Sequence, residues 1–212
     1  MTGIRVERGL KYFVHLNVPR VIKFISFFFV NTSSYVTFRH SDRRSKKAEC
    51  CNSWADVLNT IPPTYETYDR YRLEAIVADS TKNWKRADSF YEIATGLTTQ
   101  PANVLNNWGY SKLTRGSYKD AERLFNDSLT HDQSNFTVKN NLVLARAAQG
   151  VYTLPSVSMT QTERAELLHT MGLSAVKRGD VSIAKGIFRE AVETHPQYFE
   201  AAVRSLEALE NS

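Results

Sequence analysis

Apolar and small residues recur at helical spacing in NNWGYSKLTRGSYKDAERLF, which spans residues 106–125. Gly109 and Ala121 are small, Phe125 follows Ala121 by four positions, and Gly116 interrupts the pattern between them. Residues three or four apart share one face of a helix, and glycine tolerates the left-handed conformation in which many helices end. The stretch therefore predicts two helices, joined by a tight turn and packed closely at the small residues.

The same pattern recurs in a fixed register along the chain. One copy lies 34 residues earlier and another lies 63 residues later. A half copy at 136–150 fills the gap between the second and third copies, and its Asn140 and Asn141 repeat Asn106 and Asn107 at a spacing of 34. The equivalent positions are Ala75, Lys82, Trp84, Ala87, Tyr91 and Ala94; Gly109, Gly116, Tyr118, Ala121, Phe125 and Ser128; and Gly172, Gly179, Val181, Ala184, Phe188 and Ala191, with Pro196 after the last copy.

Each group of equivalent positions has a physical role in a helix–turn–helix unit. The small residue of the first helix allows its partner to approach, and the aromatic residue of the second helix fills the space between the two. The residue before each second helix is a candidate N-cap, because short polar side chains accept hydrogen bonds from free backbone N–H groups. These candidates are Asn83, Ser117 and Asp180.

This pattern resembles the tetratricopeptide repeat over residues 65–212. The sequence therefore predicts an all-α fold, a tetratricopeptide-repeat helical solenoid in which antiparallel helix pairs stack into a right-handed superhelix. A four-helix bundle is the alternative, but a bundle does not require a 34-residue register. The predicted helices span 65–81, 84–97, 101–114, 118–131, 135–149, 162–177 and 181–194, with a capping helix from 197 onward and short helical material at 54–60.

The predicted helix at 135–149 has no second helix after it. The segment Val151–Thr162 contains Pro155 and several polar residues, which predicts a loop in place of that helix. Thr160 and Glu163 have the spacing of a capping box, which marks the start of the next helix. The final helix has one apolar stripe and a polar opposite face, as a terminal repeat requires; the stripe consists of Phe199, Ala202, Leu206 and Leu209.

Charge divides the chain into two parts. Residues 1–50 carry ten basic and three acidic side chains, net +7, whereas the remaining 162 residues carry 17 basic and 19 acidic side chains, net −2. The formal net charge of +5 therefore reflects the N-terminal segment and does not indicate a nucleic-acid surface on the repeats. We predict an N-terminal extension at 1–51 and a repeat domain at 52–212, with about three full repeats, one unpaired helix and a capping helix.

The N-terminal extension combines basic residues with a short apolar stretch, Phe24–Val30. That stretch is shorter than the roughly 20 apolar residues of a spanning helix, and it resembles a secretory signal without a small-x-small cleavage site. Three interpretations remain open: an export or anchoring segment, a poorly ordered extension or upstream translation start, and a membrane-surface patch at RRSKK, residues 43–47. Cys50 and Cys51 are adjacent, a spacing that suits neither a disulfide nor a metal site.

The sequence contains no motif typical of an active site. It has no glycine-rich phosphate loop and no nucleophile elbow, and its histidines lack metal-ligand spacing. We therefore predict a protein that is not an enzyme and that uses no metal, cofactor, small-molecule substrate or nucleic acid. The histidines are His15, His40, His131, His169 and His195.

Binding of other proteins is the function that remains, on the concave surface lined by the first helix of each pair. The asparagines could pair with an extended peptide backbone or form hydrogen bonds between neighbouring helices, and His169 could contact a partner or have an ordinary packing role. The aromatic residues Trp84, Tyr91, Trp108, Tyr118, Phe125 and Phe188 are expected to pack between helices. The candidate partner-binding residues are Arg72, Ile76, Asn103, Asn106, Asn107, Tyr110, Asn140, Asn141, Leu144, His169, Leu173 and Lys177.

Three stretches carry a narrower resemblance. LNNWGYSKLTRGSYKDAERLF, TVKNNLVLARAAQGVYTLPSVSMTQTERAELLHTMGLSAVKRGDV and AVETHPQYFEAAVRSLEAL are similar to the tetratricopeptide family of the bacterial tight-adherence (Flp) pilus assembly system, TadD, in its alphaproteobacterial form. The resemblance covers about residues 55–209. It implies a non-enzymatic assembly factor of the cell envelope, and family members are typically lipoproteins that support the secretin and the pilus machinery. Glu49 precedes Cys50, so the lipoprotein cleavage motif of the family is absent here.

Two functional hypotheses follow. The first is a scaffold in Flp pilus assembly and type II-like secretion, located in the periplasm or at the outer membrane, with pilus components or the secretin as partners. The second is a soluble cytoplasmic adaptor or cochaperone that binds peptide tails, if the N-terminal segment is not a functional signal.

Overall fold

The computed structural model of the chain describes residues 58, 60, 62, 64 and 66–211. The short helix expected at 54–60 and the interpretations of the N-terminal extension therefore fall on residues that lie largely or wholly outside the described part. The chain divides into two compact units, the first ending at Thr98 and the second beginning at Thr99. Every regular element in the described part is a helix, which confirms the predicted all-α class.

In the described part of the first unit, α4 (Tyr68–Ser80) and α5 (Trp84–Gly96) form a helix pair. Thr67 caps α4 by accepting a hydrogen bond from the Arg70 backbone N–H, which leads the chain into the helix. Tyr91 on α5 is 2% exposed, and its hydroxyl donates to Asp79 Oδ2 on α4 at 2.9 Å. A buried aromatic residue therefore joins the two helices, as the repeat pattern predicts.

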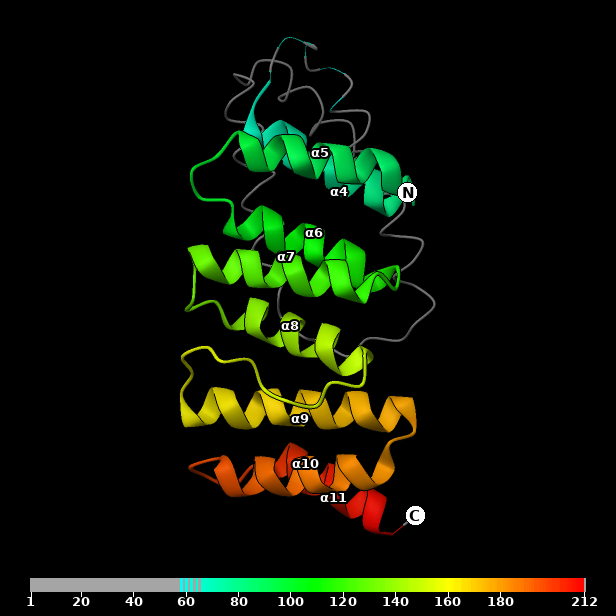
Figure 1. Cartoon of the computed structure of the whole chain (residues 1–212), viewed down its shortest axis with the longest axis vertical. Helices are drawn as coiled ribbons and strands as arrows, with labels where there is room; N and C mark the ends of the chain where they lie inside the picture. The colour runs from blue at the N-terminus through cyan, green and yellow to red at the C-terminus, as the bar shows by residue number, and fades with distance from the viewer. Residues whose placement is uncertain (1–57, 59, 61, 63, 65, 212) are drawn as a thin grey trace, which may run out of the picture. The chain divides into compact units, whose positions relative to one another are not determined.

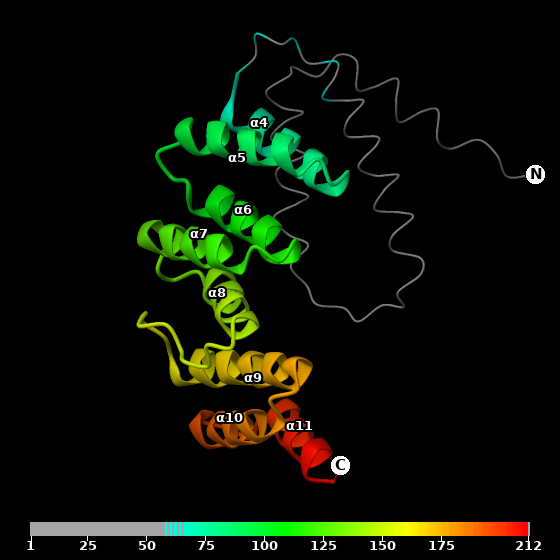
Figure 2. The same ribbon diagram turned by 45° about the vertical axis from the view of Figure 1, so that its right-hand side comes forward.

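The second unit contains six helices in chain order (Figure 1). They are α6 (Ala102–Thr114), α7 (Tyr118–His131), α8 (Phe136–Ala148), α9 (Gln161–Arg178), α10 (Val181–Thr194) and α11 (Glu200–Glu210). Helices α6 and α7 form one pair and α9 and α10 another, while α8 packs between α7 and α9 and α11 packs on α10. Figure 2 shows the same order from a second direction. This is the predicted tetratricopeptide-repeat helical solenoid, with an unpaired helix at the predicted place.

In both helix pairs of the second unit, the two helices approach closely where a glycine of the first helix faces an aromatic ring of the second. A Cβ atom on Gly109 would lie 2.6 Å from Phe125 Cε1, and a Cβ on Gly172 would lie 2.4 Å from Phe188 Cε1. Both rings are fully buried. At the equivalent position α8 carries Val143, which is 1% exposed. Because α8 has no second helix that supplies a ring, a larger residue fills this space.

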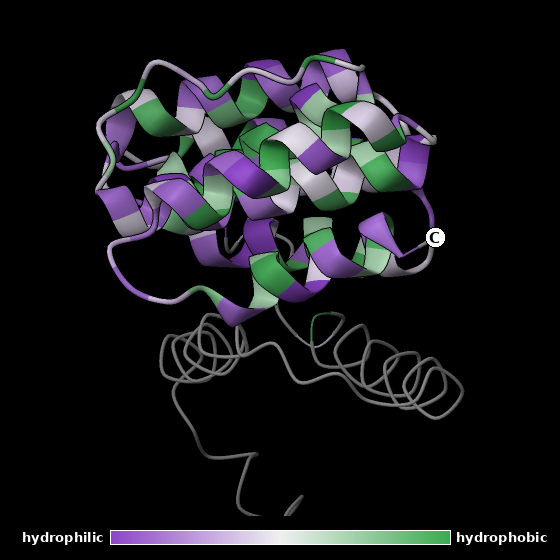
Figure 3. Cartoon of the chain, turned by 90° about the horizontal axis from the view of Figure 1, so that it is seen from below, coloured by the Kyte–Doolittle hydropathy of each residue, from purple (hydrophilic) through white to green (hydrophobic). Residues whose placement is uncertain are grey.

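Polar and apolar positions alternate around the helices (Figure 3). The apolar stripes of α8, α9, α10 and α11 meet in one buried cluster that includes Leu167, Met171 and Phe188. The predicted stripe of α11 joins this cluster through Phe199, Ala202, Leu206 and Leu209. The capping helix begins at Glu200 rather than at 197, because the His195 ring and the Gln197 backbone form a turn with an N–H···Nδ1 contact of 3.1 Å.

Of the three predicted N-cap residues, one caps its helix through its side chain and two do not. Asn83 caps α5 by accepting from the Arg86 N–H. Ser117 and Asp180 occupy the N-cap positions of α7 and α10, but their side chains form no capping hydrogen bond. Asp180 instead accepts hydrogen bonds from Tyr152 and Arg178. The prediction of a side-chain cap is therefore correct for one of these three helices.

A ten-residue irregular segment, Val151–Thr160, replaces the missing second helix after α8 (Figure 1). Its Leu154 and Met159 pack against the cluster of α8 to α11, while Val157 packs against the cluster of α7 and α8. Pro155 is buried. The segment ends in the predicted capping box, with Thr160 and Glu163 bonded reciprocally. We call Val151–Thr160 the connecting segment.

Candidate protein-binding face

The first helices of the second unit are joined by a ladder of side-chain hydrogen bonds. Asn141 Nδ2 on α8 donates to Asn106 Oδ1 on α6 at 3.0 Å. Thr170 Oγ1 on α9 donates to Asn140 Oδ1 on α8 at 2.9 Å. The two bonds are equivalent to each other: in both, the residue at the repeat position of Asn107 donates to the residue at the repeat position of Asn106 on the preceding first helix. The register read from the sequence is therefore also the register of the packing. The hydrogen bonds between helices that the sequence left open are thus present for these asparagines.

The ladder continues to the capping helix with different residues. His169 occupies the repeat position of Asn106 and Asn140, and its Nε2 lies 3.1 Å from Ser205 Oγ on α11. The His169 ring also contacts Phe188 and Phe199, with ring centroids 5.6 and 5.4 Å away. Burial is the main cause that lowers the pKa of His169. His169 therefore packs α11 onto the last helix pair.

Beside the ladder lies a row of larger apolar side chains, which we call the apolar row. It consists of Tyr110 on α6, Leu144 on α8 and Leu173 on α9, which share one repeat position. Tyr110 is 54% exposed and Leu173 is 49% exposed, while Leu144 is half-buried. Large apolar side chains with this exposure at repeated positions are typical of a surface that binds another protein.

No residue at the ladder and apolar-row positions of α6, α8 and α9 is acidic, lysine or arginine. Charge occurs one turn away on α9, at Glu166 toward its start and at Lys177 toward its end, and both are exposed. Asn107 is half-buried and Asn103 is exposed. Asn103 also lines a cavity of about 350 Å³ with His131 and Asp132, at the start of α6.

Two of the predicted partner-binding residues belong to the first unit. Arg72 is 5% exposed and forms an ion pair with Asp69 at 3.7 Å. Ile76, which has the repeat position of the apolar row, is half-buried. In the second unit Asn141 is 7% exposed, so its side chain serves the ladder rather than an open surface.

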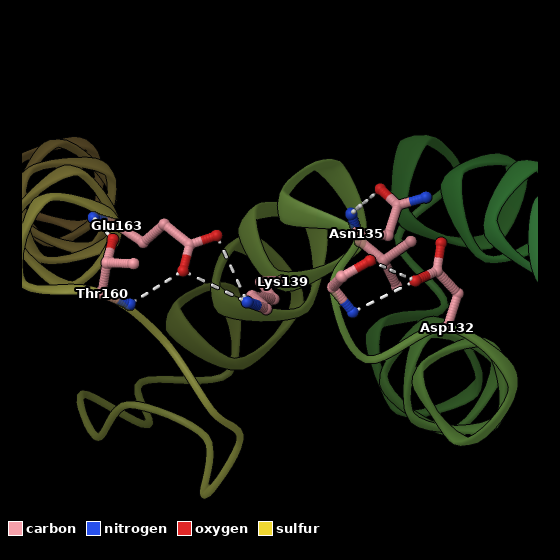
Figure 4. Close-up of polar contacts among 7 residues, drawn as sticks. Asp132, Asn135, Lys139, Thr160 and Glu163 are labelled. Carbon is pink, nitrogen blue, oxygen red and sulfur yellow. Dashed lines mark hydrogen bonds and ion pairs between the residues drawn. The ribbon is translucent and has the colours of Figure 1, made fainter.

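A second polar site was not identified from the sequence. Lys139 on α8 is 2% exposed, and its Nζ lies 3.3 Å from both carboxylate oxygens of Glu163 on α9 (Figure 4). The Glu163 carboxylate also accepts from the Thr160 backbone N–H at 2.9 Å. These residues line a cavity of about 410 Å³ together with Ser134 and Met159. The capping-box spacing locates Glu163, but nothing in the sequence pairs it with a lysine 24 positions earlier.

Near the Lys139–Glu163 pair, polar side chains stabilise the turn before α8. Asp132 accepts from the Ser134 hydroxyl at 2.7 Å and from its backbone N–H at 3.1 Å (Figure 4). The hydroxyl bond is the largest of the causes that lower the pKa of Asp132. Asn135 then caps α8 by accepting from the Val138 N–H. These local bonds fix the entry of the chain into α8.

The start of the connecting segment is held by the charged side chains of Asp180 and Arg178. The Tyr152 hydroxyl donates to the Asp180 carboxylate, and Arg178 Nε donates to the same hydroxyl at 3.1 Å. Arg178 Nη1 also donates to the Ala148 carbonyl at 2.8 Å. The hydrogen bond from Tyr152 is the main cause that lowers the pKa of Asp180, while burial is the first cause that raises the pKa of Tyr152.

Among the described residues, no group of three or more histidine, cysteine and acidic side chains is arranged to hold a metal. Within that same part of the chain, no helix has the length and hydrophobicity needed to cross a membrane.

Comparison with known proteins adds a structural likeness. No family profile matches the chain, and no curated protein matches it. A solved structure described as "Functional Characterization of Pseudomonas Aeruginosa pilF" has 16% sequence identity and a TM-score of 0.45, over 79% of this chain and 87% of that chain. The fold assignment therefore rests on the helix pairs, the glycine–aromatic contacts and the ladder described above.

Proposed function

We propose that this chain is a non-enzymatic scaffold that binds an uncharged, extended segment of a partner protein across α6, α8 and α9. The observation that carries the proposal is the apolar row, in which Tyr110 and Leu173 are about half exposed. Exposing apolar side chains of this size costs free energy that burial in a complex recovers, at about 25 cal/mol per Å². Their repetition on neighbouring helices indicates one continuous contact surface.

The spacing and chemistry of the face favour an extended partner. Packed helices lie about 8–10 Å apart, and an extended polyproline II segment returns a side chain to the same face every three residues, about 9.3 Å. Asn106 and Asn140 use Oδ1 as acceptor in the ladder, which leaves their Nδ2 groups for a partner. An extended backbone has carbonyl groups for these donors, whereas a helix has already used its own.

The charge of the face argues against the capture of acidic peptide tails. A terminal carboxylate is bound most strongly by arginine or lysine, and the centre of this face is uncharged. Lys177 lies at the end of α9, one turn from Leu173. The face therefore favours the scaffold hypothesis over the peptide-tail adaptor.

For the biological setting we propose Flp pilus assembly and type II-like secretion at the cell envelope, with pilus components or the secretin as partners. The support is the sequence resemblance of the unpaired helix, the connecting segment and the HPQYF turn to that family. The unpaired helix is α8, the connecting segment follows it, and the HPQYF turn lies between α10 and α11. The N-terminal extension would provide the export signal in this setting.

The test is affinity capture of the tagged full chain from the envelope fraction of its host, followed by mass spectrometry. The double variant Tyr110→Ala/Leu173→Ala should lose the partner, because truncating the few large anchor residues of an interface costs about 2 kcal/mol or more each. The matched control is Tyr118→Ala/Ile183→Ala, which removes exposed apolar side chains from the second helices α7 and α10.

Three results can be distinguished. Recovery of secretion or pilus components that depends on the apolar row supports both the face and the setting. Recovery of unrelated partners through the same face supports the scaffold and rejects the setting. Equal capture by the test and control variants would reject the proposed face.

A further inference from the structure

The capping helix α11 is held by a small set of contacts. Ala202 is its only fully buried residue among those described. The Phe199 ring, directly before the helix, contacts the His169 ring at 5.4 Å and stacks on the His195 ring at 4.9 Å. On the outside, Arg189 of α10 forms an ion pair with Glu210 at 2.7 Å. A short helix with few buried contacts has a low free energy of local opening.

The proton on the His169 ring can be assigned from the neighbouring hydrogen bonds. The Ser205 hydroxyl donates to the Ala201 carbonyl at 2.8 Å, so its oxygen is free to accept from His169 Nε2 at 3.1 Å. The neutral ring therefore carries its proton on Nε2. A second proton would add to Nδ1 and place a positive charge on a ring that lies between Phe188 and Phe199.

No charged side chain offsets that positive charge. The causes that shift the pKa of His169 are burial, which lowers it, and the hydrogen bond to the Ala201 backbone, which raises it. The charged residues of α11 near its start, Glu200 and Arg204, pair with each other. The other titratable groups of the elements packed here are Lys139 and Arg146 on α8, Glu163, Arg164, Glu166, Lys177 and Arg178 on α9, Lys185, Arg189, Glu190 and Glu193 on α10, His195 and Tyr198 in the turn, and Glu207 and Glu210 on α11.

We propose that His169 acts as a pH-sensitive latch, so that α11 opens from the last helix pair more often as the pH falls. Opening would remove Phe199, Ala201 and Ser205 from the ring and return it to water. Charge is stabilised in water relative to a buried apolar site, so the open form binds the proton more tightly. By linkage, protonation then shifts the equilibrium toward the open form.

The direction and the pH range follow from the lowered pKa. In the open form the ring has the ordinary histidine pKa of about 6.5, and in the closed form its pKa is lower. The contribution of His169 to docking is therefore complete above about pH 6.5. It decreases as the pH falls from that value through the pKa of the closed form.

The ladder itself supplies the variant that tests this latch. Asn106 and Asn140 occupy the repeat position of His169, and each accepts a hydrogen bond from the next first helix. His169→Asn replaces the imidazole with a side chain that can bond Ser205 but does not titrate. His195→Asn is the matched control, because it removes the other histidine that contacts Phe199.

The experiment is amide hydrogen exchange of the full chain at pH 7.5 and pH 5, corrected for the intrinsic exchange rate. In the wild type and in His195→Asn, exchange of the Glu200–Glu210 amides should rise several-fold at pH 5 relative to the amides of α6 and α7. In His169→Asn this increase should disappear. An equal increase in His169→Asn, or no increase in the wild type, would overturn the proposal.

A second measurement covers the case in which His169→Asn fails to dock α11 at either pH. In an NMR titration of the wild type, the α11 amide shifts should follow the midpoint of His169, and this midpoint should lie below about 6.5. Amide shifts of α11 that follow the midpoint of another group, or that do not move, would reject the latch.

Discussion

At the scale of single residues, the contact between Gly172 and Phe188 decides how closely α9 and α10 approach. A Cβ atom at Gly172 would lie 2.4 Å from Phe188 Cε1, closer than two carbon atoms can pack. The ring is fully buried, so it has no open space into which to move. The glycine is required here by packing and not by backbone conformation.

The first prediction compares two glycines of this helix pair. Gly172→Ala should lower the free energy of unfolding by about 1–3 kcal/mol through overpacking. Gly186→Ala on α10 should raise it by about 0.5–1 kcal/mol, because alanine is the better helix former and a Cβ there meets nothing within 4 Å. Urea denaturation measures both changes. Similar stabilities for the two variants would contradict the packing described here.

A second prediction concerns the turn within each pair. Gly116 and Gly179 have φ values of +84° and +89°, and Lys82, at the equivalent position of the first unit, has φ +59°. Left-handed backbone costs a non-glycine residue about 1–2 kcal/mol. Gly179→Ala should therefore destabilise the protein by about that amount, whereas Lys82→Gly should be tolerated or stabilising. Thermal unfolding of the two variants, with opposite signs expected, checks the assignment of the turn.

At the scale of elements, the connecting segment is a packed substitute for a helix. It is bonded at one end by Tyr152 to Asp180 and at the other by Thr160 to Glu163. Apolar side chains between these ends cover two neighbouring clusters. Val143 occupies the space that a second-helix ring fills in the other pairs, so a helix with the usual aromatic residue would collide with it.

The third prediction separates the charge of Glu163 from its capping role. Glu163→Gln preserves the capping-box geometry but leaves the buried Lys139 ammonium without a counter-charge, which should cost about 1–3 kcal/mol or more. Lys139→Met removes the buried charge and fills a similar volume, and the Glu163 carboxylate left behind is partly exposed and still bonded to Thr160. It should therefore cost less than Glu163→Gln. Urea denaturation of both variants provides the measurement. If Glu163→Gln is the better tolerated of the two, Lys139 does not depend on Glu163.

At the scale of the whole molecule, the ladder joins successive first helices of the second unit. Its bonds run from α6 to α8, from α8 to α9 and from α9 to α11. These helices are neighbours in space but are separated by a second helix or by the connecting segment in the chain. The ladder thus fixes the register between neighbouring first helices of the second unit, and the apolar row beside it stays in line as a result.

The fourth prediction follows from the ladder. Asn106→Ala and Asn140→Ala should each lower the free energy of unfolding by about 0.5–1.5 kcal/mol, the typical net value of a hydrogen bond. Thr137→Ala is the control, because Thr137 is exposed on α8. Partner affinity measured on the same variants separates the two roles of the amides. A loss of affinity without a loss of stability would assign the asparagines to the partner alone.

The sequence by itself determined the helix pairs, the turns and the unpaired helix. Small and aromatic residues at a 34-residue spacing are a local pattern, and local patterns set where helices begin, end and bury a face. The same register also placed Tyr110, Leu144 and Leu173 at one position of the first helices. The fold class and the shared repeat position of these three residues could therefore be predicted from the sequence, whereas their exposure could not.

Only the tertiary structure decided which polar groups meet. The pairs Lys139–Glu163, Tyr152–Asp180 and His169–Ser205 join residues 24, 28 and 36 positions apart. No periodic pattern specifies such contacts, because they depend on which side chains of different elements are brought together by packing. Asp180 shows the difference clearly: its position before a helix was predictable, but the hydroxyl that it accepts from comes from a segment with no repeat pattern at all.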